Sequence, residues 1–291
     1  MRVTESRMLE IAQDSLGKAR ESVARKGEQL SSGMRVARAS DDVASWAEGI
    51  RARTRLAQEE AFGGAIKRTR ERLYQAEGAL ETIGDVMRRV TELAVQSANE
   101  TTGTWRSTAA VEVRNLMATA IQAANMKAED GEYLFSTFSA TSAPFSSAGV
   151  YSGTTAARQV DVATGQRIQA NIPGSRLTVS SGVDVFDVLG DIATAMEAGD
   201  RAAVAAELDR LAQARDQVNL ARGELGGYTQ ALDAADQARE GVMETLIRVR
   251  SRAVDIDAIR SATELAQAKN TLESAQVAAE EIFQVVGRIT R

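Results

Sequence analysis

Residues 265–289 read LAQAKNTLESAQVAAEEIFQVVGRI, and apolar side chains recur there every three or four positions without a break. That spacing places them along one side of an α-helix, as a narrow seam that must be buried against another helix. A second stripe covers residues 9–30, where only Lys26 interrupts it. Two seams at opposite ends of the chain predict that the ends pair with each other. Their position at the termini also favours contact with neighbouring chains.

We expect these stripes to form an assembly interface. The N-terminal stripe contributes Leu9, Leu16, Val23 and Leu30. The C-terminal stripe contributes Leu265, Leu272, Ile282, Val286 and Ile289. Most other stripe positions are alanine, whose small side chain lets two helices approach closely. Close approach serves a core within one chain as well as an interface between chains, so the stripes alone leave both possibilities open.

The composition excludes several classes of function. The 291 residues contain no cysteine and no histidine. Without cysteine, disulfides, thiolate nucleophiles and cysteine metal sites are excluded. Without histidine, the usual near-neutral acid–base group and transition-metal ligand are missing. Any enzyme here would have to work with carboxylates, lysine, serine or tyrosine, which disfavours catalysis without excluding it. We expect no catalytic, cofactor-binding or metal site, and no enzymatic activity.

Charge and hydropathy indicate neither a nucleic-acid partner nor a membrane span. The chain has 35 Lys and Arg residues against 40 acidic residues, and this small excess implies no highly charged partner. Basic residues in 51–72 are interleaved with glutamates, which predicts pairing of opposite charges along one helix. No stretch approaches 18 apolar residues. The first eight residues lack the apolar region of a signal peptide, so we expect a cytosolic chain or export without a cleaved signal.

The N-terminal part is predicted to be helical. A first helix over residues 5–30 should end at Ser31-Ser32-Gly33, with Gly33 as its C-terminal cap. Ser40-Asp41-Asp42 predicts the start of a second helix, with a capping hydroxyl followed by two acids at the positive end of the helix dipole. Apolar spacing continues from there to residue 94, and Gly63-Gly64 is the weak point, where the helix bends or tolerates the glycines.

The pattern changes after residue 130. Both prolines and six of the twelve aromatic residues fall between residues 133 and 186. Alternating apolar and polar residues in 159–162, 168–172 and 177–179 predict short strands, with turn signals between them. We therefore expect a small β-rich insertion over residues 131–185, between helical parts at 1–130 and 186–291.

The C-terminal part is again predicted to be helical. Gly199-Asp200 should separate a short helix from the next one, and the glycine cluster in 223–227 predicts a break between helices. A change of phase between Ile256 and Leu265 predicts a stutter or a short break. The expected fold is mainly α, a long antiparallel helical bundle or coiled coil formed by both termini, with a small β-rich inserted domain.

The turn between the first two helices resembles the N-terminal signature of the bacterial flagellin superfamily. The similar segments are residues 29–36, QLSSGMRV, and residues 39–44, ASDDVA. In that signature a helix ends in a Leu-Ser-Ser-Gly turn, a basic residue follows, and an Asp-Asp pair opens the next helix. Met34 stands here at a position often held by lysine. The resemblance adds Gly33, Asp41 and Asp42 to the expected assembly interface.

The middle of the chain is similar to one family within that superfamily, the hook–filament junction proteins or third hook-associated proteins. The segments that carry this similarity are residues 131–136, GEYLFS; 158–162, RQVDV; 185–192, VFDVLGDI; and 222–226, RGELG. Ser136-Thr137 departs from the Ser/Ala-Gly turn expected there. The resemblance covers about residues 3–190 and 220–289.

This resemblance implies a structural role in the bacterial flagellum. The chain would self-assemble into a ring and join the first hook-associated protein to the flagellin filament. It would leave the cell unfolded through the flagellar type III secretion apparatus, with its C-terminal helix held beforehand by an export chaperone. Its location would be extracellular, and its terminal stripes would pack as concentric helical layers.

Three other interpretations are weighed against this one. The chain could be a flagellin, the repeating subunit of the filament itself. It could be a coiled-coil signalling or scaffolding protein, although the aromatic β-rich insertion is out of place in an uninterrupted rod. An enzyme is the fourth interpretation, and no constellation of residues supports it.

Overall fold

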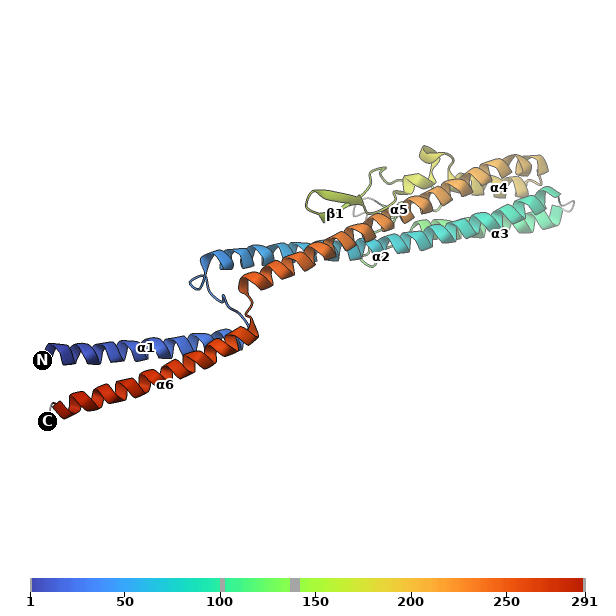
Figure 1. The fold of residues 1–291 in the computed structure, drawn as a ribbon. Helices are drawn as coiled ribbons and strands as arrows, with labels where there is room; N and C mark the ends of the chain where they lie inside the picture. Colours follow the sequence, from blue (N-terminus) through green and yellow to red (C-terminus); the bar gives the residue numbers. More distant parts are fainter. Residues whose placement is uncertain (1, 100–102, 137–141, 290–291) are drawn as a thin grey trace. The chain divides into compact units, whose positions relative to one another are not determined.

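The computed structural model describes residues 2–99, 103–136 and 142–289 (Figure 1). The chain divides into two compact units. The first comprises Met1–Gln58 together with Val242–Arg291, and the second comprises Glu59–Gly241. Two long helices, α2 (Val43–Asn99) and α5 (Arg201–Val254), contribute to both units.

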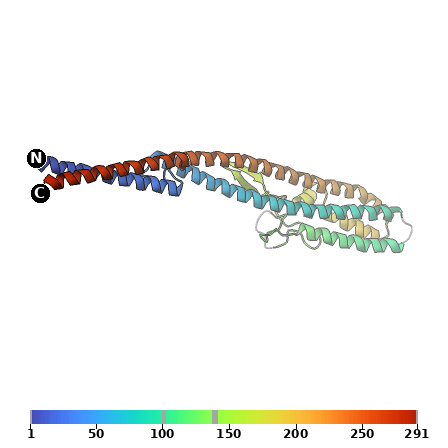
Figure 2. The ribbon, with the colours of Figure 1, turned by 60° about the horizontal axis from the view of Figure 1, so that its bottom comes forward.

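The first unit is built around the two terminal helices. α1 (Arg2–Ser32) and α6 (Ala258–Ile289) lie side by side and run antiparallel in Figures 1 and 2. The stripes meet along this pair, where Ala12, Ala19 and Ala279 are buried and the larger stripe residues are half-buried. The prediction that the two ends of the chain pair with each other is therefore confirmed.

The second unit is a helical bundle with one apolar core. It contains α3 (Gly103–Ala124) and α4 (Val185–Glu197), which pack against each other, together with most of α2 and α5. Side chains from all four helices share this core, among them Leu80, Met87, Val113, Leu189 and Leu211. α4 begins where Asp184 accepts hydrogen bonds from the backbone N–H groups of Phe186 and Asp187. This confirms that helix resumes near Phe186.

The β structure within the described residues is smaller than predicted. β1 (Gln159–Ala163) pairs antiparallel with β2 (Gln166–Gln169), with Val160 opposite Ile168. The strand predicted at 177–179 is wrong, because short 3-10 turns occupy Gly174–Leu177 and Val179–Ser181. The hydroxyls of Thr178 and Ser180 both donate to the carbonyl of Ser175, at 2.9 Å. Such local side-chain bonds favour a turn over a strand.

The aromatic residues join the insertion to the helical core. The ring centroid of Phe145 lies 5.0 Å from that of Tyr151 and 5.1 Å from that of Phe186 at the start of α4. Phe135 and Phe145 are buried in the same cluster as the helices of the second unit. The non-helical segment is thus held in place by packing against the bundle.

The predicted break at 223–227 is wrong, because α5 continues through it from Arg201 to Val254. Ala221, Leu225 and Leu232 are buried on the core side of the helix, and their packing outweighs the glycine cost of about 1 kcal/mol each. The glycines themselves are exposed. By contrast, a short break near Ile256 is confirmed, since α5 ends at Val254 and α6 begins at Ala258, whereas the chain is helical from there through Leu265.

The helix α2 also continues through its glycine pair. At Gly63 the missing side chain leaves room for Arg239 of α5, because a Cβ atom there would lie 2.9 Å from the Arg239 Cζ atom. The helix is therefore unbroken at Gly63-Gly64. None of the helices within the described residues is long and apolar enough to cross a bilayer.

Candidate functional site

Two breaks in the helices, far apart in sequence, are bonded to each other in the first unit. Gly33 ends α1 with a φ of 70°, a left-handed conformation that glycine adopts without strain. The N–H of Ile256 donates to the Gly33 carbonyl at 3.0 Å, and the N–H of Arg35 donates to the Val254 carbonyl at 2.8 Å. Residues 33–36 and 254–256 thus form one joint, which we call the terminal joint.

The side chain of Arg35 completes the terminal joint. Its Nη2 atom donates to the Ala253 carbonyl at 2.7 Å and to the Ser45 hydroxyl at 3.0 Å. Its Nη1 atom lies 3.5 Å from Oδ2 of Asp42. The guanidinium therefore links the last turn of α5 to the first turn of α2. This gives a physical role to the basic residue of the Leu-Ser-Ser-Gly signature.

The two residues of the predicted pair, Asp41 and Asp42, have different structural roles. Asp42 caps α2, because its Oδ1 atom accepts from the N–H groups of Ala44 and Ser45. The hydrogen bond from the Ser45 hydroxyl is the main cause that lowers the pKa of Asp42. Asp41 instead accepts from the N–H groups of residues 37 and 38 and fixes the preceding turn. The expected cap by the Ser40 hydroxyl is therefore wrong.

Six of the predicted interface residues lie half-buried along the α1–α6 pair. They are Leu9, Leu16, Val23, Leu30, Leu265 and Leu272. Ile282 is half-buried as well, whereas the side chains of Val286 and Ile289 lie outside the described residues. The remaining predicted residues, Gly33, Asp41 and Asp42, lie in the connection between α1 and α2. Contact of any of these residues with a second chain stays a prediction.

Sequence reasoning missed a second set of apolar side chains on the terminal helices. They are exposed rather than turned into the seam, and they comprise Met8 and Ile11 on α1 and Ile259, Val277, Phe283 and Val285 on α6. These positions are scattered outside the three-four row that identified the stripes. Only the burial of the seam against its partner helix distinguishes the two sets.

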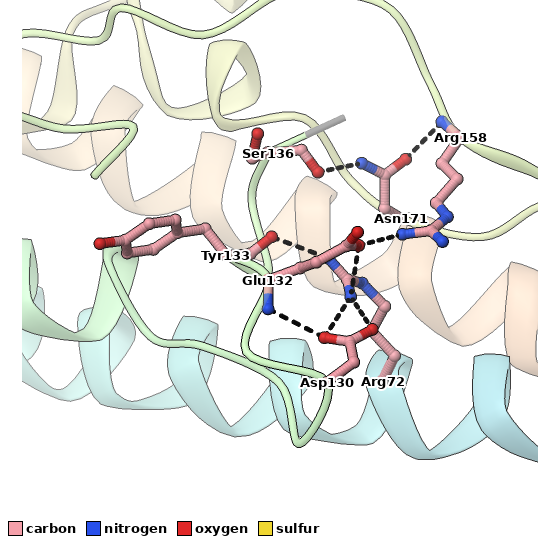
Figure 3. A network of polar contacts seen from close by, with 7 residues as sticks. All are labelled: Arg72, Asp130, Glu132, Tyr133, Ser136, Arg158 and Asn171. Carbon is pink, nitrogen blue, oxygen red and sulfur yellow. Dashed lines mark hydrogen bonds and ion pairs between the residues drawn. The ribbon is translucent and has the colours of Figure 1, made fainter. Parts of the chain in front are cut away.

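A buried arginine was also missed, in the second unit. The side chain of Arg72 is only 9% exposed and lies 3.1 Å from Oδ2 of Asp130 and 3.5 Å from Oε2 of Glu132 (Figure 3). Its Nη2 atom also donates to the carbonyl of Tyr133 at 2.8 Å. Desolvation is the main cause that lowers the pKa of Arg72, which stays far above neutral pH as an arginine.

The same network reaches the β hairpin. Glu132 forms an ion pair with Arg158, which directly precedes β1. Asn171 accepts from the N–H of Arg158 at 2.7 Å and donates to the Ser136 carbonyl at 3.2 Å (Figure 3). Arg72 on α2 thus bonds directly to the segment before the hairpin, and Glu132, Arg158 and Asn171 extend the network to the residues on either side of the hairpin.

The charge pairing predicted along α2 is wrong for the two least exposed basic residues of the 51–72 run, Arg70 and Arg72. Arg72 pairs with the insertion, as described, and Arg70 lies 2.9 Å from Asp233 and 3.2 Å from Asp236, both on α5. These partners lie on other elements instead of one turn away on the same helix. The basic run therefore holds elements together. Among the described residues no three Asp or Glu side chains gather in a way that could hold a metal ion.

Comparison with known proteins indicates where this architecture recurs. Residues 4–140, a little under half of the chain, match the family described as the bacterial flagellin N-terminal helical region. A flagellin of Halalkalibacterium halodurans is 38% identical over 74 residues, which are 25% of this chain and 27% of that protein. The chain thus matches only about a quarter of the length of this relative.

Solved structures are similar over a larger part. A Vibrio parahaemolyticus protein assigned as a flagellar hook-associated protein aligns with a TM-score of 0.68 and 21% identity, covering 74% of this chain and 100% of that one. FlgL of Bacillus cereus aligns with a TM-score of 0.59 and 22% identity, covering 69% and 98%. The flagellar junction protein FlgL of Legionella pneumophila aligns with a TM-score of 0.59 and 15% identity, covering 72% and 100%. The chain has the fold of these proteins.

Proposed function

We propose that this chain is a structural component of the bacterial flagellum, an adaptor that joins the hook-associated junction protein to the flagellin filament. The observation that supports this most directly is the shared fold, which extends over the whole length of the Legionella pneumophila junction protein. The N-terminal match to the flagellin helical region supports the same assignment. The role requires no catalysis.

A flagellin subunit is the second candidate function. The 38% identical stretch of the Halalkalibacterium halodurans protein favours it, because that relative is a flagellin. The stretch is only 74 residues long, however, whereas the similarity to FlgL structures covers about 70% of the chain. The junction assignment therefore has the broader support.

Deletion of the gene distinguishes the two candidates. Loss of a junction protein leaves hooks without filaments and flagellin shed into the culture medium, whereas loss of a flagellin leaves nothing to shed. Electron microscopy of the cells and immunoblotting of the medium measure both results. Bare hooks together with shed flagellin are expected. Normal filaments, or bare hooks with no flagellin in the medium, would contradict the junction role.

The terminal helix pair supplies a mechanism for this role. Isolated helices are marginal in water and gain most of their stability from packing. The α1–α6 pair buries one side of each helix and leaves Ile11, Val277 and Val285 more than half exposed. In this proposal the pair becomes fully ordered when neighbouring copies in a ring cover these side chains.

Partners and location follow from the proposed role. The chain would contact the first hook-associated protein on one side and flagellin on the other. It would be exported through the flagellar type III apparatus, with an export chaperone on its C-terminal helix. The exposed apolar residues Val277, Phe283 and Val285 on α6 are consistent with a partner that covers them before assembly.

A further inference from the structure

Two short arginine runs lie on the parts of α2 and α5 that belong to the first unit. Residues 51–55 read RARTR, and residues 248–252 read RVRSR. These two helix segments contain six arginines and only two acidic residues, Glu48 and Glu244. They are therefore strongly basic, although the chain as a whole has a net charge of -5.

The two runs lie at the same level of the first unit. Gly49 and Val254 are in contact, because a Cβ atom at Gly49 would lie 2.6 Å from the Val254 Cγ1 atom. Arg53 and Arg250 line one small groove. α2 leaves the terminal joint and α5 enters it, so a residue further along α2 meets one equally far back along α5. Counting on from these two contacts brings the runs level along their whole length. We call them together the arginine belt.

The arginine belt has no acidic partner within the described part of the chain. The ion pairs of the first unit join other residues. Five of the six arginines are exposed, and Arg250 is half-buried. Their like charges repel one another, and no carboxylate offsets this cost within the copy. Ile50 and Ile247 lie beside the runs and are 40% and 44% exposed. Arginine next to exposed apolar side chains is typical of a protein–protein interface.

The outer side of α6 carries the opposite charge. Residues 270–287 contain three charged side chains, Glu273, Glu280 and Glu281. All three are exposed, and none forms an ion pair with another described residue. Val277 lies between Glu273 and Glu280 at helical spacing and is 59% exposed. We call these three glutamates the acidic face. Like the arginine belt, it combines unpaired charge with exposed apolar surface.

Other acidic stretches of the chain have partners of their own. Asp130 and Glu132 lie close to Arg72, as described above. The carboxylates in residues 184–200 that cap α4 or α5, or pair with an arginine, are Asp184, Asp191, Glu197 and Asp200. The acidic face of α6 is therefore better suited than these stretches to receive the arginines.

We infer that the arginine belt of one copy binds the acidic face of α6 in a second copy. The two surfaces are opposite in charge, and each is unpaired within its own copy. Because they are different surfaces, one copy can bind a neighbour on each, in the head-to-tail contact that builds rings and helical assemblies. This contact does not depend on the proposed flagellar role, since it is tested with the purified protein alone.

The absence of native cysteine allows the contact to be trapped as a disulfide. Two full-length variants are mixed in equal amounts at low salt and oxidised: Thr54→Cys in the arginine belt and Ala278→Cys beside the acidic face. Both positions are exposed. Random collision gives twice as much mixed dimer as either same-site dimer, and intact mass spectrometry separates the three. The contact should raise the share of mixed dimer above this ratio by about three- to tenfold.

Two controls show whether the excess is due to a specific charged contact. About 1 M salt screens charges beyond about 3 Å and should remove the excess of mixed dimer. Thr119→Cys places the first cysteine at an exposed position of α3 in the second unit. Its mixture with Ala278→Cys should give the random ratio.

Matched variants test each surface separately. Arg51→Gln/Arg55→Gln should lower the excess of mixed dimer at least threefold. Arg88→Gln/Arg114→Gln removes the same charge from arginines that already have carboxylate partners, so it should leave the excess unchanged. Both double variants keep long polar side chains, and circular dichroism checks that they keep the helix content of the parent.

Charge reversal tests the pairing of the two surfaces. Glu280→Lys/Glu281→Lys in the protein with the α6 cysteine should abolish the excess, and Arg51→Glu/Arg55→Glu in its partner should restore it. A random ratio in the parent mixture, or an excess that survives both the glutamine and the lysine variants, would overturn the inference. A random ratio together with arginine-dependent binding to phosphatidylglycerol vesicles would overturn it in favour of a membrane partner.

Discussion

Arg35 shows how one side chain can explain why a sequence signature contains a basic residue. It bonds to the last turn of α5, to Ser45 and to Asp42, while its own N–H bonds to Val254. Two helix ends therefore depend on one guanidinium. A lysine has three donors on a single atom and cannot reproduce this forked geometry.

Replacement of Arg35 should loosen the terminal joint. Each hydrogen bond of a charged group contributes about 1.5–3 kcal/mol, so Arg35→Ala should raise amide exchange in residues 43–47 and 250–257 by at least tenfold. Hydrogen exchange with mass spectrometry measures this. Arg38→Ala is the matched control, because Arg38 lies in the same turn, is 71% exposed and, among the described residues, forms an ion pair with Glu28 alone. Equal effects of the two variants would contradict the role of Arg35.

The seam should weaken in acid. The hydrogen bond from Lys26 is the main cause that lowers the pKa of Glu264. Because the folded pKa is lower than the unfolded one, of about 4.3, the carboxylate stabilises the pair above that pH and loses this effect as pH falls through the folded pKa. Exchange protection of α1 and α6 should therefore drop between about pH 5 and pH 3. A Glu264→Gln variant should show a smaller drop in protection. If its pH profile of exchange protection were identical to that of the unmodified protein, protonation of Glu264 would be excluded as the cause.

Arg72 should matter more for stability than an exposed arginine of the same helix. Arg72→Met leaves Asp130 and Glu132 without their buried partner and should lower the free energy of unfolding by about 2–3 kcal/mol. Urea titration measures the change. The control is Arg88→Met, because Arg88 is 68% exposed and pairs with Asp85 on its own helix. A similar loss of unfolding free energy in both variants would contradict the anchoring role of Arg72.

Residue roles were predictable from sequence only where the partners are local. The helix start at Ser40-Asp41-Asp42 was recognised because a cap bonds to N–H groups two or three positions away, although the cap is Asp42 and not the expected Ser40. Arg72 was not, because Asp130 and Glu132 lie 58 and 60 positions further along the chain. Without a fold, nothing distinguishes its partners from the glutamates beside it.

At the scale of elements, α2 and α5 show two different uses of glycine in a helix. In α5 no atom lies within 4 Å of a Cβ built at Gly226 or Gly227, so these glycines leave open surface. In α2, Gly63 accommodates the guanidinium of Arg239. Helix continuity through both sites comes from packing, which outweighs propensity.

Substitution of these glycines should have opposite effects. Gly226→Ala should stabilise the second unit by about 1 kcal/mol, because alanine fits the open site and is the better helix former. Gly63→Ala should destabilise it by about 1 kcal/mol, because the new Cβ displaces Arg239 from its ion pair with Asp236. Thermal unfolding measures both. A gain in stability for Gly63→Ala would contradict the close packing described here.

The order of helices was predictable because the apolar periodicity is long and nearly free of proline. The prediction of a break at 223–227 was wrong, because local helix propensity gives no measure of the packing contributed by Leu225 and Leu232. The prediction of a third strand was wrong because its alternating stretch, Leu177-Thr178-Val179, is too short to exclude a turn held by hydrogen bonds from hydroxyl groups. In both cases, contacts that form only in the folded chain decided the structure of a short segment.

At the scale of the whole molecule, the two units have different packing. The second unit has a continuous core with many fully buried side chains, including Phe135, Phe186 and Leu80. In the first unit the seam of α1 and α6 is mostly half-buried, and large apolar residues such as Ile259 remain exposed. A part with little buried surface opens more readily than a packed core. This difference suits a protein whose termini complete their packing in an assembly.

Hydrogen exchange of α1 and α6, measured on the free protein and on flagella that contain it, tests this account most directly. The account predicts weak protection of residues 7–30 and 260–285 in the free protein, strong protection of the same residues in the assembly, and unchanged protection of the second unit. Full protection of the terminal helices in the free protein, or no gain on assembly, would contradict it.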